Sequence, residues 1–294
     1  MSCKSITAFT IAILALSAGA PPLAIGAEAR IVSLDAGTTE TLYALGVGDH
    51  VVARDSGSTY PESAQSLPVI SDGHQINVEA VLAERPTLVI GRNRAMSGPG
   101  MHLLEQAHVD VVRLPDEPGV DIAKERIDVL GQLLGKQDRA VELKEAIDKD
   151  MGELERAVME MGDHPKLSVL ILYLRPGVAM MMGEDSNAAA MVQLARGSFA
   201  IPGLEGYKSL NPEAVVAAQP DVILCYADGL EASGGVDALL QRPGIKETPA
   251  GKNKRIVAMD DVLLSGFGPR TGEAALTLWK RLYQPRDAVA KVDP

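Results

Sequence analysis

The side chains able to carry out catalysis or to bind a metal ion are dispersed along this chain. The histidines are His50, His74, His102, His108 and His164. No two of them have His-x-x-x-His spacing, and there is no Cys-x-x-Cys pair. The Gly-x-Ser-x-Gly turn that exposes a catalytic serine and the glycine-rich phosphate loop are absent from the sequence as well. These absences favour a binding protein over an enzyme, because tight binding sites need none of these motifs.

The N-terminus has the plan of a secretory signal. Lys4 precedes an apolar and small-residue run over 6–20, and small residues lead to Ala-Glu-Ala at 27–29. The run is shorter than the roughly 20 apolar residues that a membrane-spanning helix needs. We therefore expect residues 1–27 to be a signal peptide and the mature protein to be soluble and periplasmic. An N-terminal membrane anchor is the alternative.

The composition restricts partners and cross-links. The net charge is −11 and the isoelectric point is near 5.0, whereas a nucleic-acid partner demands a basic surface. Only Cys225 follows the signal. No intramolecular disulfide is then possible in the mature chain, so its stability must come from packing.

Short β-branched segments alternate with helical segments, which predicts parallel α/β sheets. The predicted strands cover residues 30–34, 51–54, 87–90, 110–114, 167–174, 221–225 and 255–259. The predicted helices cover residues 40–45, 78–84, 101–107, 188–194, 212–218 and 271–282. Thr38 or Thr39 is the expected cap of the first helix.

Between the two halves lies a charged segment without proline, whose apolar residues have helical spacing. Its position near the midpoint predicts a helix at 137–162 that connects two lobes, at 28–136 and 163–294. An ordinary surface helix of the first lobe is the alternative.

The two halves also share an internal repeat. Residues 76–90 and 210–224 both place Asn at a helix cap, Glu in the first turn, an apolar stripe along the helix, and proline before a strand. One lobe is therefore expected to resemble the other.

Four segments carry a resemblance to a known family: Ser58-Thr-Tyr60-Pro61, Gly206-Tyr207-Lys208, Gly234-Gly-Val-Asp237, and Leu264-Ser-Gly-Phe-Gly-Pro-Arg270-Thr. They resemble the haem-binding branch of the periplasmic binding proteins that serve ferric-siderophore, cobalamin and haem importers. The resemblance runs from Arg30 to about Tyr283.

That resemblance implies an α/β fold of two lobes, each a mainly parallel sheet flanked by helices, joined by one long helix. It also implies a monomer that captures haem and delivers it to an ABC permease of the inner membrane, with an outer-membrane receptor system upstream. A siderophore or cobalamin carrier of the same class is the alternative. The single tryptophan, Trp279, favours haem, because siderophore pockets tend to be rich in Arg, Trp and Tyr.

The resemblance assigns the site residues as follows. Tyr60 matches the axial iron ligand, and its phenolate oxygen is a hard donor that suits ferric haem. Tyr207, in the Gly-Tyr-Lys segment, is expected at the same site. The two haem propionates need cations, for which arginine is well suited by its planar fork. The candidates are loop arginines at strand ends, Arg92, Arg94, Arg175 and Arg270. We favour the last three, although Arg270 could instead tie down its own turn.

The sequence departs from that branch at two places. His74 stands in a segment where many members carry an arginine, and it could contact a propionate, bind iron as a second ligand, or do neither. Met181 lies in a methionine-rich segment, 179–183, that the resemblance places on a loop where some relatives present a histidine. A thioether is a soft ligand for ferric iron, so Met181 is expected to cover a porphyrin face or to fill the core.

Two acidic residues, Glu79 and Glu213, occupy equivalent positions in the internal repeat. In the family, acidic residues at these helix starts lie on the outer tips of the lobes and meet arginines of the permease. Docking is therefore the implied role. Stabilisation of the helix start is the alternative, because a carboxylate there interacts favourably with the helix dipole.

Overall fold

The computed structural model describes residues 29–72, 76–96, 99–107 and 109–284. The predicted signal peptide, His74 and His108 lie outside these ranges. Within them, no helix combines the length and apolarity required to cross a membrane.

The first lobe is built on a five-stranded parallel sheet in the order β3-β2-β1-β4-β5. The strands are β1 (Ile31–Ser33), β2 (Val51–Asp55), β3 (Val69–Ser71), β4 (Leu88–Arg92) and β5 (Asp110–Leu114). The helices are α1 (Ala36–Ala44), α2 (Val78–Ala83), α3 (Pro99–Gln106) and α4 (Val120–Leu133), with short 3-10 turns at Gly48–His50 and Glu62–Ser66. Apolar side chains on both faces of the central strand β1 are fully buried, as expected of a parallel sheet covered on both sides.

The second lobe is built on a mixed sheet in the order β11-β10-β6-β7-β9, with β8 pairing β6. Its strands are β6 (Ser168–Arg175), β7 (Val178–Met182), β8 (Ser198–Phe199), β9 (Tyr207–Ser209), β10 (Val222–Tyr226) and β11 (Ile256–Met259). Strand β7 runs antiparallel to both β6 and β9. The helices are α6 (Asn187–Leu194), α7 (Pro212–Ala218), α8 (Ala227–Ala232), α9 (Gly235–Leu240), α10 (Pro249–Lys252), α11 (Asp261–Ser265) and α12 (Thr271–Tyr283).

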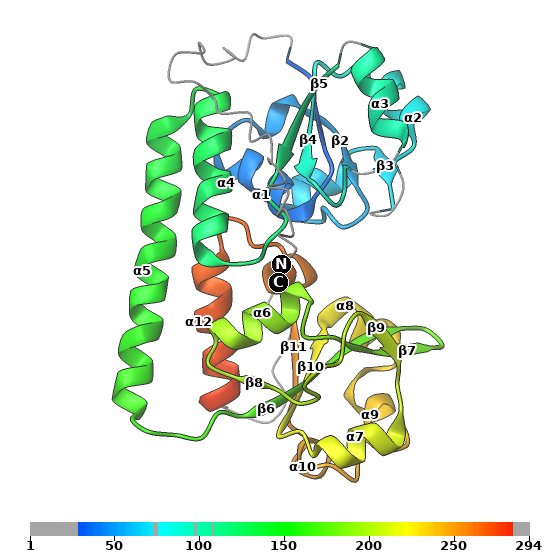
Figure 1. Cartoon of the computed structure of the whole chain (residues 1–294), viewed down its shortest axis with the longest axis vertical. Coiled ribbons are helices and arrows are strands. Elements are labelled where there is room, and N and C mark those ends of the chain that lie inside the picture. Colours follow the sequence, from blue (N-terminus) through cyan, green and yellow to red (C-terminus); the bar gives the residue numbers. More distant parts are fainter. Residues whose placement is uncertain (1–28, 73–75, 97–98, 108, 285–294) are drawn as a thin grey trace, which may run out of the picture.

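Helix α5 (Gln137–Met161) joins the lobes and contributes to the cores of both (Figure 1). Leu143 and Ile147 pack in the core of the first lobe, and Leu154 packs in the core of the second. Helix α12 begins at a loop that contacts the first lobe, runs into the second lobe and packs along α5. The predicted fold class, two α/β lobes joined by one long helix, is confirmed, and α5 is not a surface helix of the first lobe alone.

The internal repeat forms the same local structure twice. The Asn77 side chain accepts a hydrogen bond from the backbone N–H of Ala80 at 3.0 Å, and the Asn211 side chain accepts one from Ala214 at 3.1 Å. Each cap opens a short helix, α2 or α7, that leads to a buried strand. The expected likeness between the lobes is therefore present at this unit.

The cap expected for the first helix was wrong. Helix α1 begins at Ala36, and Asp35 is its N-cap, accepting a hydrogen bond from the backbone N–H of Thr38 at 3.0 Å. A carboxylate is as good a cap as a hydroxyl, and Asp35 follows β1 after a single residue. The helix therefore starts immediately after the strand.

Candidate functional site

Tyr60 lies in the loop that follows strand β2, between the lobes, and its side chain is 40% exposed. Its peptide bond to Pro61 is cis. The base of the loop is fixed by the buried carboxylate of Asp55, which accepts hydrogen bonds from the backbone N–H of Gly57 at 3.2 Å and from the Ser58 hydroxyl. The Ser58 hydroxyl also lies 2.7 Å from the hydroxyl of Thr39 on α1. These contacts tie the Tyr60 loop to the first turns of α1.

Arg270, from the start of α12, reaches across to Tyr60 in the other lobe. Its guanidinium carbon lies 3.6 Å from the centroid of the Tyr60 ring. Its Nε donates to Glu40 Oε1 at 2.6 Å, and its Nη2 lies 3.5 Å from Glu40 Oε2. Burial alone would lower the pKa of the Arg270 guanidinium, but the hydrogen bond and charge of Glu40 raise it on balance.

A cavity of about 450 Å³ borders this group. Tyr60, Glu40 and Arg270 line it together with residues of α5, including Leu143 and Ala146. Its volume falls within the about 300–1,000 Å³ typical of small-molecule sites. The tyrosine therefore lies beside a space that spans elements of both lobes and the connecting helix.

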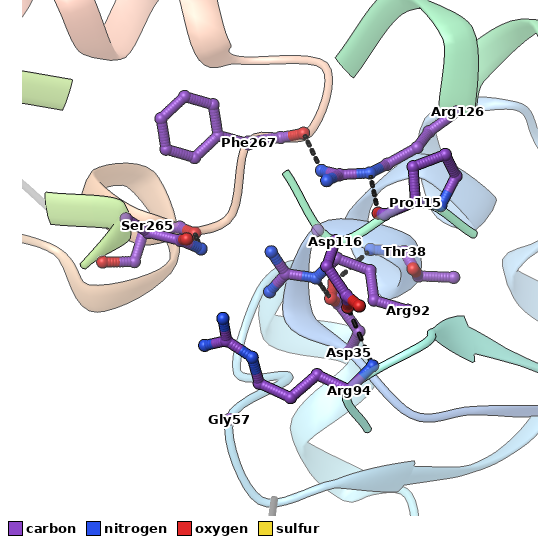
Figure 2. Close-up of polar contacts among 12 residues, drawn as sticks. Asp35, Thr38, Gly57, Arg92, Arg94, Pro115, Asp116, Arg126, Ser265 and Phe267 are labelled. Carbon is purple, nitrogen blue, oxygen red and sulfur yellow. Dashed lines mark hydrogen bonds and ion pairs between the residues drawn. The ribbon is translucent and has the colours of Figure 1, made fainter. Parts of the chain in front are cut away.

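The loop that carries Arg270 is held closely by the first lobe (Figure 2). Arg126 of α4 donates to the backbone carbonyl of Phe267 at 3.4 Å. Gly37, in the first turn of α1, approaches Gly266 so closely that an added Cβ would lie 2.2 Å from the Gly266 carbonyl oxygen. Only a residue without a side chain fits at position 37, so backbone packs directly against backbone here.

Charged side chains gather where the strands of the first sheet end (Figure 2). Arg92 forms an ion pair with the buried Asp35, and Asp116 accepts a hydrogen bond from the backbone N–H of Arg94 at 2.8 Å. These residues line a pocket of about 180 Å³. Burial, together with the charge of Arg92, lowers the pKa of Arg126 to about 10. The edge is therefore strongly charged, but much of its charge is internally paired.

Tyrosines gather at the facing part of the second lobe. The rings of Tyr207 and Tyr226 both pack edge-to-face on Tyr173, with centroid distances of 5.7 and 6.4 Å. Partial burial raises the pKa of the Tyr207 phenol, whereas the charge of Arg94 opposes that rise. Arg94 belongs to the opposite lobe.

Arg175 extends from the end of β6 beside this group. Its guanidinium carbon lies 4.6 Å from the Tyr173 ring centroid, and its Nη2 lies 3.7 Å from Asp261 Oδ2. Burial, with the nearby charge of Asp228, raises the pKa of Asp261 to about 6.

The chain was compared with known proteins. The model of the family described as periplasmic binding protein matches residues 31–263. This chain belongs to that family.

Solved members of the family resemble this periplasmic binding protein over most of its length. The periplasmic heme-binding protein RhuT from Roseiflexus sp. RS-1, in its apo form, is 38% identical, with a TM-score of 0.80 over 87% of this chain and 98% of that chain. The periplasmic heme-binding protein BhuT, in complex with two hemes, is 32% identical, with a TM-score of 0.80 over 86% of this chain and 97% of that chain. The ABC transporter substrate-binding lipoprotein YvrC of Bacillus subtilis (strain 168), whose function is uncharacterized, is 27% identical over 86% of this chain and 80% of its own length.

Five of the predicted site residues lie between the lobes of this periplasmic binding protein. Tyr60 and Arg270 are in contact. Arg94 and Tyr207 belong to opposite lobes, and the charge of Arg94 opposes the rise in the pKa of the Tyr207 phenol. Arg175 is 40% exposed at the side chain and lies against Tyr173.

Three predicted residues lie elsewhere, and one is not described. Met181 is 4% exposed within the core of the second lobe, which favours core filling over contact with a ligand. Its segment is strand β7 and not a loop, because it pairs on both sides with β6 and β9. Glu79 and Glu213 are exposed on α2 and α7, in different lobes. His74 falls outside the described residues.

Sequence reasoning missed Glu40, Tyr173 and Tyr226. Tyr173 lies in a predicted strand two residues before Arg175, so strand alternation places both side chains on one face of the sheet. Tyr226 directly follows another predicted strand. A position at or near the end of a predicted strand could therefore have marked both tyrosines as candidate site residues. Nothing local marks Glu40, which lies inside a helix.

Proposed function

We propose that this periplasmic binding protein captures haem between its lobes and delivers it to an ABC permease of the inner membrane. The observation that carries the proposal is the pair formed by Tyr60 and Arg270: an exposed phenol with a guanidinium held 3.6 Å from its ring centroid, between the lobes. The haem-binding relatives RhuT and BhuT, similar over nearly their whole lengths, support the choice of solute.

Tyr60 would hold ferric haem through its phenolate oxygen. A phenolate is a hard, anionic donor, and tyrosine is one of the established axial ligands of haem iron. The Arg270 guanidinium, whose carbon lies 3.6 Å from the ring centroid, makes a cation–π contact with Tyr60 and places a positive charge over one face of the ring. The electrostatic interaction with Tyr60 also raises the pKa of the Arg270 guanidinium.

The remaining residues would match the other parts of haem. Arg94 and Arg175 extend from the two facing lobes and would bind propionates. Tyr173 and Tyr207 offer aromatic surface to the apolar macrocycle, and Tyr207 is 52% exposed. Arg175 shares its charge with Asp261.

Glu79 and Glu213 are proposed as contacts with arginines of the permease. The helix caps are supplied by the side chains of Asn77 and Asn211, so the carboxylates are not needed for that task. Three residues after each carboxylate stands an exposed apolar residue, Leu82 at 38% and Val216 at 37%. Each lobe thus presents a charge beside an apolar side chain.

The docking proposal predicts a separation of binding from transport. The double variant Glu79→Lys and Glu213→Lys is expected to bind hemin like the wild type and to lose haem uptake by cells that depend on this importer. Glu155→Lys, which reverses an exposed charge on α5, is the matched control and should transport normally. Normal uptake by the double variant would contradict docking at these carboxylates.

We also propose that the protein is exported to the periplasm by a signal peptide over residues 1–27 and acts there as a monomer. Its mature parts would be the lobes 28–136 and 163–294 with the connector 137–162. N-terminal sequencing of the protein recovered from a periplasmic extract tests the export. A mature chain that retained Met1 would contradict the cleavage.

Titration with hemin tests the central proposal. The wild type is expected to give a saturable spectrum with the charge-transfer band of ferric tyrosinate haem, and Tyr60→Phe is expected to abolish that band. Tyr43→Phe, which removes a hydroxyl from the same cavity, should leave the band in place. A band that survived in Tyr60→Phe would reject Tyr60 as ligand. No saturable change in the wild type would reject haem, and ferric siderophores and cobalamin would be titrated next.

A further inference from the structure

We infer that Glu40 is a positioning residue for the Tyr60 site: its buried carboxylate fixes the Arg270 guanidinium over the Tyr60 ring and thereby strengthens the bond between tyrosine and iron. The inference rests on the proposed function, since haem supplies the iron. Glu40 itself does not contact the solute in this role and acts only through Arg270.

The geometry of the contact makes it directional. Both oxygens of Glu40 face the Arg270 guanidinium, with Nε–Oε1 at 2.6 Å and Nη2–Oε2 at 3.5 Å. Two contacts along one edge fix the plane of the guanidinium as well as its position. The same group covers the Tyr60 ring at 3.6 Å. The carboxylate therefore determines which face of the arginine meets the tyrosine.

The carboxylate of Glu40 is buried, and burial disfavours its charged form. It is 4% exposed, and burial raises the pKa of its carboxyl while the Arg270 hydrogen bond and charge oppose that rise. Buried ion pairs contribute little to stability compared with apolar residues of similar size, because desolvation offsets the attraction. A role in positioning accounts for a buried carboxylate that stability does not require.

The backbone on both sides of the pair is also fixed. Gly37, one turn before Glu40 on α1, packs against the Gly266 carbonyl, and Gly268 packs against Gly37 in turn. Arg126 holds the Phe267 carbonyl at 3.4 Å. The loop leading to Arg270 is thus attached to the helix that carries Glu40.

Removal of the Glu40 charge should release the guanidinium from the ring. Glu40→Gln is therefore expected to speed haem dissociation by about tenfold or more and to shift the tyrosinate charge-transfer band. A tenfold change in the rate of haem loss corresponds to about 1.4 kcal/mol.

The experiment measures the charge-transfer band and the rate of haem loss to an excess of apomyoglobin. The variants are Glu40→Gln, Arg270→Ala and the double variant, each in the whole mature protein. Glu273→Gln is the matched control, because this carboxylate lines the same cavity and acts on Arg270 by charge alone. It should behave like the wild type. In the Arg270→Ala background, Glu40→Gln should have no further effect.

Two results would overturn the inference: a band and rate in Glu40→Gln equal to those of Glu273→Gln, or an undiminished Glu40→Gln effect when Arg270 is already alanine. The second result would identify a general structural role for Glu40. Faster haem loss from Glu40→Gln without a shift of the charge-transfer band would identify the same role and would also overturn the inference. Should Glu40→Gln fail to fold, Glu40→Asp keeps the charge one methylene farther away and is expected to show the same shift, reduced. Failure of the proposed function looks different, because the wild type itself would then lack the tyrosinate band.

Discussion

The two lobes are alike on their outer sides and unlike where they face each other. Both carry the same cap, short helix and buried strand, at α2 with β4 and at α7 with β10. At the facing edges, the first lobe presents ion pairs such as Asp35 with Arg92, and the second presents the cluster of Tyr173, Tyr207 and Tyr226.

The difference separates two tasks. An outer surface that appears twice suits a partner that offers the same contact twice, whereas two unlike inner surfaces suit a solute with unlike parts. A flat, apolar macrocycle with a metal centre and charged edges has such parts. The first lobe would supply the iron ligand and charges, and the second would supply aromatic surface.

The largest effect is expected from breaking the ion pair of the first lobe. Asp35→Asn keeps a good helix cap but leaves Arg92, whose side chain is 19% exposed, without its carboxylate and near Arg126. Losing one partner of a buried pair typically costs about 3–5 kcal/mol. Urea unfolding should show a loss of about 3 kcal/mol.

The control for that variant is Glu84→Gln in the more exposed ion pair with Arg30. Exposed pairs contribute less than about 1 kcal/mol, so its unfolding midpoint should hardly change. Equal losses of unfolding free energy in Asp35→Asn and Glu84→Gln would show that the ion pair at the facing edge stabilises the fold no more than an exposed pair.

A smaller effect is expected from the aromatic surface. Tyr207→Ala removes an exposed ring that packs on Tyr173 at 5.7 Å, and aromatic contacts contribute about 0.5–1.5 kcal/mol beyond buried area. Hemin affinity should fall about threefold to tenfold, with the tyrosinate band unchanged. Tyr207→Phe keeps the ring and should retain the affinity. Loss of the band in Tyr207→Ala would instead place an iron ligand on the second lobe.

The smallest effect concerns Asp261, whose pKa is raised to about 6 by burial and by Asp228. Since the unfolded value is about 3.9, the folded form binds a proton more tightly. This group therefore stabilises the fold below about pH 4, and that contribution disappears as the pH rises through about 6. Because the side chain is 32% exposed, the effect should be about 1 kcal/mol or less.

Unfolding of Asp261→Asn across this pH range measures the contribution. The variant should lack that part of the pH dependence and gain on the wild type above pH 6. One oxygen of Asp261 has no hydrogen-bond partner within the described part of the chain, which fits a carboxylate that is easily replaced. An identical pH profile in wild type and variant would contradict the raised pKa.

Local patterns were enough to predict most of the framework. The strands β1, β2, β4, β6, β10 and β11 and the helix α5 were expected from runs of β-branched residues or helical periodicity. Strand β3 has only two β-branched residues between Pro68 and Ser71, which is too short a run to mark a strand, and β7 was hidden because methionine has no strong strand preference. Helix α4 was also missed, although its apolar residues repeat at helical spacing.

The site was predictable only where a motif or a strand end marked it. Tyr60 and Arg270 were both predicted as site residues, but their contact with each other and the contact of Arg270 with Glu40 were not. Residues so far apart in the chain, 230 positions for Glu40 and Arg270, meet only through the tertiary fold. Such pairings depend on how the lobes meet. For Met181 the chemistry of the side chain was not enough, because methionine suits both a hydrophobic core and a porphyrin face. Only its position in β7 decides between the two roles.

The parallel packing of α12 along α5 affects how the protein could serve as a sensor. The connecting helix α5, with α12 packed along its second-lobe half, forms a stiff frame, so dyes attached to the outer ends would change their separation little on binding. An energy-transfer reporter of that design would give a weak signal. A single environment-sensitive dye at Ser209, on the exposed strand that begins with Tyr207, would report binding through its surroundings instead.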